Sequence, residues 1–210
     1  MFKREINFAK DPIRILGRRY ALTKTSYKYI DIAIVVKRES YVDIALGDCN
    51  GKEISLTADM WRDLFALRND ILGYFENGSE DPHTPTSTII GTVTIRFGKI
   101  NNLKTLRFES GKNRISMSHS TIKALFALEL CVNRIVASLT NVLEIVDNKL
   151  SKSSINYRLS IDNYRFIDIA TQIDHPSDIP EGIRQHEYFN ANDLIDCELH
   201  ALLFGLYYGL

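Results

Sequence analysis

Hydrophobic and polar residues alternate with a period of two along several stretches in the first third of the chain. Four apolar residues share one face of the stretch from Tyr29 to Lys37: Ile30, Ile32, Ile34 and Val36. The same spacing recurs at Val42, Ile44 and Leu46, and alternation of this kind predicts half-buried strands. A β-rich stretch over 18–25 and a short run over 52–56, which follows the turn pair Asn50-Gly51, complete an expected set of four antiparallel strands.

The period then changes to three and four residues. Thr57 is the expected N-cap, and the apolar stripe that follows consists of Trp61, Leu64, Phe65, Ile71, Leu72 and Phe75. This spacing predicts one amphipathic helix, whose stripe covers one face of the four-stranded sheet. Trp61, Phe65 and Phe126 are expected to be core residues.

The junction of strand and helix occurs twice. Residues 52–67 are echoed by residues 113–128, and with an offset of 61 the identical pairs are Ile54/Ile115, Ser55/Ser116, Leu64/Leu125, Phe65/Phe126, Ala66/Ala127 and Leu67/Leu128. A period near 60 residues is typical of a duplicated small domain rather than of a solenoid. The polar stretch 77–85, with Pro82 and Pro85, is the expected linker between the copies.

The second copy repeats the predicted order of elements. Alternation over 89–97, around Leu106 and Phe108, and over 114–117 predicts strands, and Ser118 is the expected cap of a helix that runs unbroken toward Val146, roughly 40 Å long. Further on, 156–161 and 164–170 are expected to form a hairpin. Asn192 is the expected cap of a final apolar helix.

The sequence therefore predicts an α+β protein of two tandem ββββα modules with pseudo-twofold symmetry. Their curved antiparallel sheets carry long helices on one face. The expected ranges are 1–77 and 86–148 for the modules and 149–210 for a C-terminal extension with a hairpin and an apolar helix.

Charge is unevenly distributed although the net charge is zero. Basic residues dominate 13–38 and 96–114, whereas acidic residues dominate beyond Gln172. The three cysteines are far apart, which favours reduced thiols and an intracellular protein, in nucleus or cytoplasm, with an organelle left open. No apolar run approaches the roughly 20 residues of a membrane helix, so no membrane association is expected.

Enzyme chemistry finds no support in the motifs. The histidines are scattered, no Cys/His spacing is typical of a metal site, and phosphate-binding glycine loops and the GxSxG motif are lacking. Cys131 lies on an apolar helix stretch and is expected to be an inert core thiol. We expect a non-enzymatic protein with no metal and no cofactor.

The junction motif resembles that of the positive cofactor four family of single-stranded-DNA-binding transcriptional coactivators. The residues that carry the resemblance are Gly51, Ile54, Ser55, Leu56, Thr57, Trp61 and Leu64. The second copy retains Ile115, Ser116, Met117, Ser118 and Leu125 but has Ile122 in place of the tryptophan. Two modules in one chain resemble the Whirly and Pur-alpha arrangement, in which tandem modules replace a dimer. The resemblance implies a nucleic-acid-binding surface on the open sheet faces.

The residue types on those expected faces fit a single strand, because cations neutralise phosphates and aromatic rings stack on bases. The candidate contacts are Arg19, Lys24, Tyr27, Lys28, Lys37, Arg38, Tyr41, Arg96, Arg107 and Arg114. A solvated strand face explains any one of these residues roughly twice as well as a nucleic-acid contact does, so the argument rests on the cluster.

Two functions remain open. The first is a single-stranded DNA- or RNA-binding protein acting in transcription, replication or RNA handling. The alternative is an oligomerising scaffold whose sheet or C-terminal helix binds protein, with a homo-oligomer formed through the second helix or the C-terminal helix. A further hypothesis is that the acidic segment 174–198 competes with nucleic acid, although solvated charges explain it about three times as well.

Overall fold

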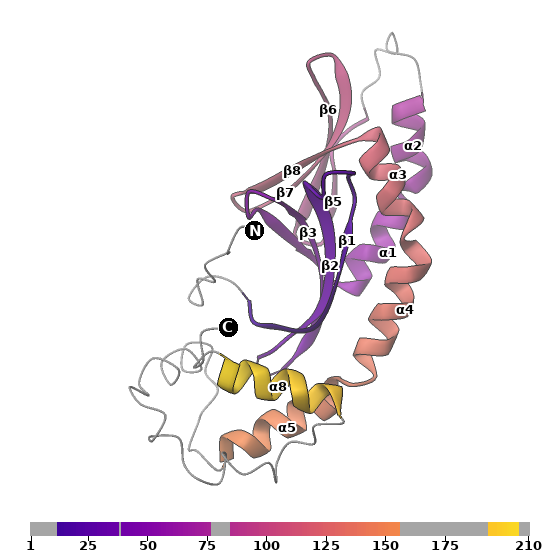
Figure 1. The fold of residues 1–210 in the computed structure, drawn as a ribbon. Helices are drawn as coiled ribbons and strands as arrows, with labels where there is room; N and C mark the ends of the chain where they lie inside the picture. Colours follow the sequence, from indigo (N-terminus) through magenta and orange to yellow (C-terminus); the bar gives the residue numbers. More distant parts are fainter. Residues whose placement is uncertain (1–11, 38, 77–84, 156–192, 206–210) are drawn as a thin grey trace. The chain divides into compact units, whose positions relative to one another are not determined.

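The computed structural model describes residues 12–37, 39–76, 85–155 and 193–205, and contains two four-stranded antiparallel sheets, each followed by helices (Figure 1). The first sheet has the strand order β1 (Arg14–Ala21), β2 (Lys28–Val35), β3 (Tyr41–Asp48) and β4 (Glu53–Leu56). The second has the order β5 (Thr88–Ile90), β6 (Val93–Ile100), β7 (Leu103–Ser110) and β8 (Asn113–Ser118). The predicted pair of ββββα modules is confirmed.

Turn chemistry joins neighbouring strands. Between β3 and β4, the Asp48 carboxylate accepts from the backbone N–H groups of Asn50 and Lys52 at 2.9 and 3.2 Å, and Gly51 adopts φ +79°. Between β6 and β7, Asn101 and Asn102 have φ +51° and +63°, the pair of positive angles that a tight two-residue hairpin turn requires. The expected turn at Asn50-Gly51 is confirmed.

The strand expected over 89–97 is interrupted, which corrects the prediction. Gly91 adopts φ +52° and lies in a two-residue turn between β5 and β6, where Ile90 pairs with Val93. A Cβ on Gly91 would lie 2.8 Å from the side chain of Met60. Alternation continues through the turn, so the pattern gave no sign of the hairpin.

The helices are shorter than predicted and break at equivalent positions. The first module has α1 (Ala58–Ala66) and α2 (Arg68–Glu76), and the second has α3 (His119–Ala127), α4 (Glu129–Thr140) and α5 (Leu143–Ile155). The residues at the first break of each module, Leu67 and Leu128, have φ/ψ of −85°/3° and −87°/0°. The prediction of one unbroken helix to Val146 is therefore wrong. The apolar residues keep the same spacing across the breaks, so the sequence pattern does not show them.

The internal repeat extends to the geometry of the helix caps. The Thr57 hydroxyl accepts from the Met60 N–H at 3.2 Å, and the Ser118 hydroxyl accepts from the Thr121 N–H at 3.4 Å. Their φ/ψ angles, −76°/166° and −78°/168°, are nearly the same. Both predicted caps are confirmed, and each satisfies a backbone donor that the first turn of a helix leaves unpaired.

Residues related by the repeat contact one another. The rings of Phe65 and Phe126 lie 5.1 Å apart, edge to face, and the side chains of Arg68 and Glu129 form an ion pair at 3.2 Å. Each pair differs by the repeat offset of 61, as expected of residues close to an approximate twofold axis. Trp61 is buried and its indole N–H donates to the Asn133 side chain at 3.0 Å, a contact that breaks the symmetry because Ile122 is the equivalent residue.

Contacts divide the chain into two compact units, which we describe separately. One comprises 17–33 and 42–139, and so contains most of both sheets and helices α1 to α4. The other comprises 1–16, 34–41 and 140–210. The two units do not coincide with the ranges 1–77, 86–148 and 149–210 expected from the sequence. The unit of 17–33 and 42–139 combines parts of both expected modules. The three expected ranges stay a prediction.

The second unit contains α5 and α8 (Leu194–Gly205). Ile195 and Leu199 of α8 are buried, and Lys149 of α5 pairs with Asp193 and Asp196. The α8 cap is Asp193, whose carboxylate accepts from the Ile195 N–H at 2.9 Å, rather than the expected Asn192. The hairpin expected over 156–170 lies outside the described residues.

Candidate functional site

The face of each sheet that points away from its helices is here called the outer face. Along each strand of the second sheet, side chains point alternately into the core and to the outer face. The core positions are buried: Val93, Ile95, Leu106, Phe108, Ile115 and Met117. The residues between them point outward: Thr94, Arg96 and Gly98 on β6, Thr105, Arg107 and Glu109 on β7, and Arg114 and Ser116 on β8. The side chains of Arg96, Arg107 and Arg114 are 49%, 45% and 67% exposed.

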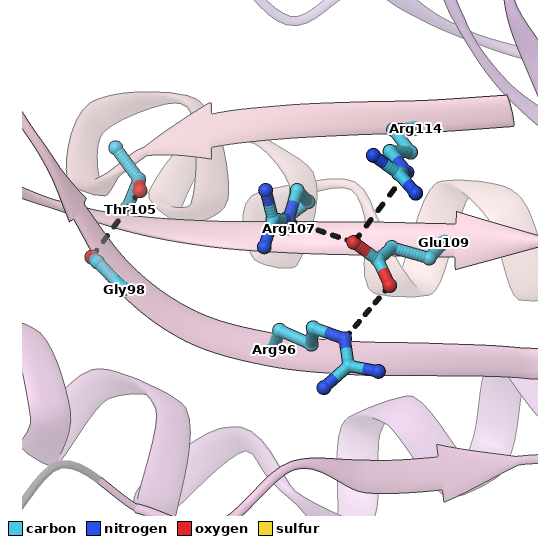
Figure 2. Close-up of polar contacts among 6 residues, drawn as sticks. All are labelled: Arg96, Gly98, Thr105, Arg107, Glu109 and Arg114. Atoms are coloured by element: carbon cyan, nitrogen blue, oxygen red, sulfur yellow. Dashed lines mark hydrogen bonds and ion pairs between the residues drawn. The ribbon is translucent and has the colours of Figure 1, made fainter.

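Strand register brings three of the expected arginines together. Arg96 lies directly opposite Arg107, and Arg114 lies opposite Glu109. The Glu109 carboxylate lies among all three: Arg96 Nε is 2.7 Å from Oε2, while Arg107 Nε and Arg114 Nε are 2.9 and 3.8 Å from Oε1 (Figure 2). We call Arg96, Arg107, Arg114 and Glu109 the arginine cluster.

The charge state of Glu109 follows from this geometry. The hydrogen bond from Arg96 is the largest cause that lowers the pKa of the Glu109 carboxyl, and the charges of Arg107, Arg96 and Arg114 add to it, against an opposing effect of desolvation. Glu109 is therefore ionised at neutral pH, and the cluster has three positive charges against one negative charge.

A concavity lies next to the cluster, on the side toward the tip of the β6–β7 hairpin. Its lining includes Arg96, Arg107, Gly98, Thr105 and Ser116. The carbonyl of Gly98 accepts from the Tyr74 hydroxyl at 2.7 Å and from the Thr105 hydroxyl at 3.2 Å, and these bonds hold the base of the hairpin. At its tip, Ile100 and Leu103 are 50% and 72% exposed. The outer positions of β6, β7 and β8 thus offer guanidinium, hydroxyl and aliphatic groups but no aromatic ring.

The outer face of the first sheet differs. Tyr29, Ala33, Asp43 and Ala45 are all buried there, so the expectation of an open face on both sheets is wrong for this one. A Cβ on Gly47 would lie 2.3 Å from the Tyr29 ring, which shows that the ring covers this position.

Arg19, expected as a nucleic-acid contact, is engaged within that face. Its guanidinium lies 3.9 Å from the centroid of the Tyr29 ring and donates to Asp31 at 2.6 and 3.1 Å. The Tyr29 hydroxyl donates to Glu53 at 2.7 Å. Ring, cation and carboxylates satisfy one another here, so this face has less positive charge to offer an anion.

Three other expected contacts lie at the connection between β1 and β2. Lys24 and Tyr27 are exposed, and Lys28 Nζ lies 5.2 Å from the Tyr27 ring centroid. The Tyr27 hydroxyl accepts from Asn50 at 2.8 Å. Desolvation lowers the pKa of Lys28, while the charges of Asp48 and Cys49 oppose that effect. These residues belong to the first sheet and are not part of the arginine cluster.

The remaining expected residues belong to the other compact unit. Lys37 Nζ lies 5.1 Å from the ring centroid of Tyr41, which is 39% exposed, and Arg38 lies outside the described residues. Of the ten expected contacts, the structure therefore brings Arg96, Arg107 and Arg114 into one site. In the acidic tail, Asp193 and Asp196 pair with Lys149, whereas 174–192 lie outside the described residues.

Sequence reasoning missed Glu109, Thr105 and Ser116. Arg107 and Glu109 are two residues apart on one strand, and this spacing places both on one face. Arg114 reaches the same carboxylate only because β7 and β8 pair with Glu109 opposite Arg114, and the spacing along one strand does not give this register. Cys131 also differs from expectation, since it is only half-buried, and a hydrogen bond with this thiol raises the pKa of Tyr20.

The described residues also bear on metal binding and on membrane insertion. Within the described residues, no group of three or more His, Cys, Asp or Glu side chains is placed to hold a metal ion. Over the same part of the chain, no helix has both the length and the apolar character needed to cross a membrane.

Comparison with known proteins identifies no family. The sequence matches no family model, and it has no significant match among curated proteins. The resemblance to the positive cofactor four family accordingly stays a prediction, and the functional argument rests on the geometry of the site.

Proposed function

We propose that this chain is a non-enzymatic single-stranded nucleic-acid-binding protein, and that the outer face of the second sheet is its binding surface. The observation that carries the proposal is the arginine cluster: three arginine side chains, each about half-exposed or more, gathered on a sheet face whose opposite side is buried. Planar guanidinium groups donate several hydrogen bonds to phosphate oxygens and remain charged at any physiological pH.

The surroundings of the cluster support a single strand as the ligand. Ser116 supplies a hydroxyl that can donate to sugar and phosphate oxygens, and Ile100 and Leu103 provide apolar surface against which an unstacked base can pack. Because outward aromatic rings are lacking on β6, β7 and β8, phosphate contacts dominate over base stacking. We therefore expect weak sequence preference and strong salt dependence. A role in transcription, replication or RNA handling is part of this proposal.

The test is a titration of labelled DNA and RNA strands of about 20 nucleotides, at low salt and at about 0.15 M salt. We expect binding that weakens steeply with salt and that Arg96→Glu with Arg107→Glu abolishes. Arg134→Glu, at an exposed position of α4, is the matched control and should bind like the parent protein. Failure of the parent protein to bind either strand at low salt would overturn the proposal.

A second candidate is the oligomerising scaffold. Leu130 on α4 is 82% exposed, and since single exposed leucines are ordinary on monomeric proteins, this residue supplies a test of the scaffold rather than support for it. Sedimentation of the full chain measures this directly. A dimer that Leu130→Ser dissociates would support self-association, whereas a monomer at all concentrations would count against it.

A further inference from the structure

Glu109 is the one acidic residue at the outer positions of β6, β7 and β8, and its side chain is 17% exposed. Arg96 and Arg107 approach it at 2.7 and 2.9 Å, and Arg114 at 3.8 Å. Several guanidinium groups that converge on one anionic group form the arrangement by which proteins bind oxyanions. In the free protein, the chain's own carboxylate supplies that oxyanion.

We propose that Glu109 holds the position that a backbone phosphate takes when a strand binds, so that it arranges the three arginines and lowers the affinity until it is displaced. This inference rests on the proposed function. A phosphodiester has one negative charge and two free oxygens, as a carboxylate does, so it can replace Glu109 without leaving the arginines unpaired.

Repulsion between the arginines explains why the free protein needs this anion. Arg96 and Arg107 lie directly opposite each other on neighbouring strands, and like charges in that relation destabilise a sheet. Glu109 accepts a hydrogen bond from Arg96 and forms an ion pair with Arg107, and these contacts hold the two side chains over the sheet. A strand that binds therefore meets donors that are already gathered in one place.

An approaching phosphate has donors available before Glu109 leaves. The arginines contact Glu109 through their Nε atoms, while the terminal nitrogens of Arg96 and Arg107 point away from the carboxylate (Figure 2). Both arginine side chains are about half-exposed, so these nitrogens are reached from solvent. Rotation about its own side-chain bonds then moves the Glu109 carboxylate aside without a change in the backbone.

Glu109→Gln tests the inference, because the amide keeps the size and one acceptor oxygen of the side chain but removes its charge. Titration of a labelled oligothymidylate of about 20 nucleotides should give about two- to fivefold tighter binding than the parent protein at low salt, the range that loss of one partly exposed competing charge gives. The gain should shrink at about 0.15 M salt because salt screens the removed charge. Glu76→Gln, at an exposed glutamate that ends α2, is the matched control.

The outcomes separate this inference from the proposed function. If the parent protein binds the strand and Glu109→Gln binds equally or more weakly, Glu109 is only a structural partner of the arginines and the inference is overturned alone. If neither protein binds at low salt, both proposals are overturned. If inorganic pyrophosphate displaces the strand at equal phosphate concentration, the position takes free phosphate and the assignment to a strand fails.

A measurement on the parent protein keeps the test valid even if the variant does not fold. The arginine Nε–H signals in a nitrogen–proton correlation spectrum report the contacts to Glu109. Saturation with the oligothymidylate should shift the signals of Arg96, Arg107 and Arg114 together. Unshifted signals while the strand is bound would overturn the inference.

Discussion

The outer faces of the two sheets have opposite properties although the same junction of strand, cap and helix follows each sheet. On the first, a buried tyrosine, an arginine and two carboxylates satisfy one another: Arg19, Tyr29, Asp31 and Glu53. On the second, three arginines share a single carboxylate and remain about half-exposed or more. The two copies match at positions on the helix side of each module, where packing restricts the choice of residue, and they differ on the outer faces.

The two outer faces also differ in how closely other side chains cover them, as the surroundings of two glycines at outer positions show. Gly47 on β3 lies under the Tyr29 ring, with 2.3 Å between an added Cβ and that ring, while a Cβ on Gly98 of β6 would have no atom within 4 Å. The first face is therefore packed and the second is open. A methyl group is the smallest probe of this difference.

The largest expected effect comes from that pair of substitutions. Gly47→Ala should lower the free energy of unfolding by about 1–3 kcal/mol, the usual cost of overpacking, because Tyr29 must move. Gly98→Ala should be neutral or stabilise by up to about 1 kcal/mol through the unfolded chain. Urea denaturation measures both; equal losses would show that the two outer faces are packed alike.

A smaller effect is expected on binding when one arginine is removed from each face. Arg107→Gln should weaken single-strand binding about tenfold at low salt, since it removes one charged contact to phosphate. Arg19→Gln should change the affinity less than about twofold, because its guanidinium is already held by Asp31 and Tyr29. Fluorescence anisotropy titrations decide between them, and a larger loss at Arg19 would reverse the assignment of the binding face.

Tyr29→Phe should lower the free energy of unfolding by about 1 kcal/mol, because it removes the hydrogen bond that the hydroxyl donates to Glu53. Tyr27→Phe is the matched control, since that hydroxyl is exposed and bonds only to Asn50 among the described contacts, so its cost should be below about 0.5 kcal/mol. Strand affinity should stay unchanged in both variants. A binding defect in Tyr29→Phe would mean that the first face also contacts the ligand.

The smallest effect concerns pH. Because the pKa of Glu109 is lowered by Arg96 and the other arginines, its contribution to stability is present above the ordinary glutamate pKa of about 4.3 and is lost as pH falls through the lower value of the folded protein. The stability of the parent protein relative to Glu109→Gln should thus be constant from about pH 5 to 8 and fall in more acidic solution. A difference that changes across neutral pH would contradict the charge state described for the cluster.

Much of the fold was predictable from local pattern. Alternation identified β2, β3, β7 and β8, and the repeated junction identified Thr57 and Ser118 as caps, because these features depend on neighbours along the chain. The first strand, expected over 18–25 from its residue types, lies instead at Arg14–Ala21. The interruptions were not predictable: the turn at Gly91 and the breaks at Leu67 and Leu128 leave the hydrophobic period intact. The spacing of apolar residues indicates which face of a helix or strand a residue occupies, but it does not indicate where a helix axis bends or a strand turns.

The sequence by itself determined the duplication, the α+β class, the caps and the outward position of Arg96, Arg107 and Arg114, because periods of two and of three to four residues are set by backbone geometry. Only the tertiary structure decided that one outer face is closed over Tyr29 and that the other gathers three arginines around Glu109. Both outcomes depend on cross-strand register and on what lies above each sheet. These are contacts between residues far apart in the chain, and local alternation does not record them.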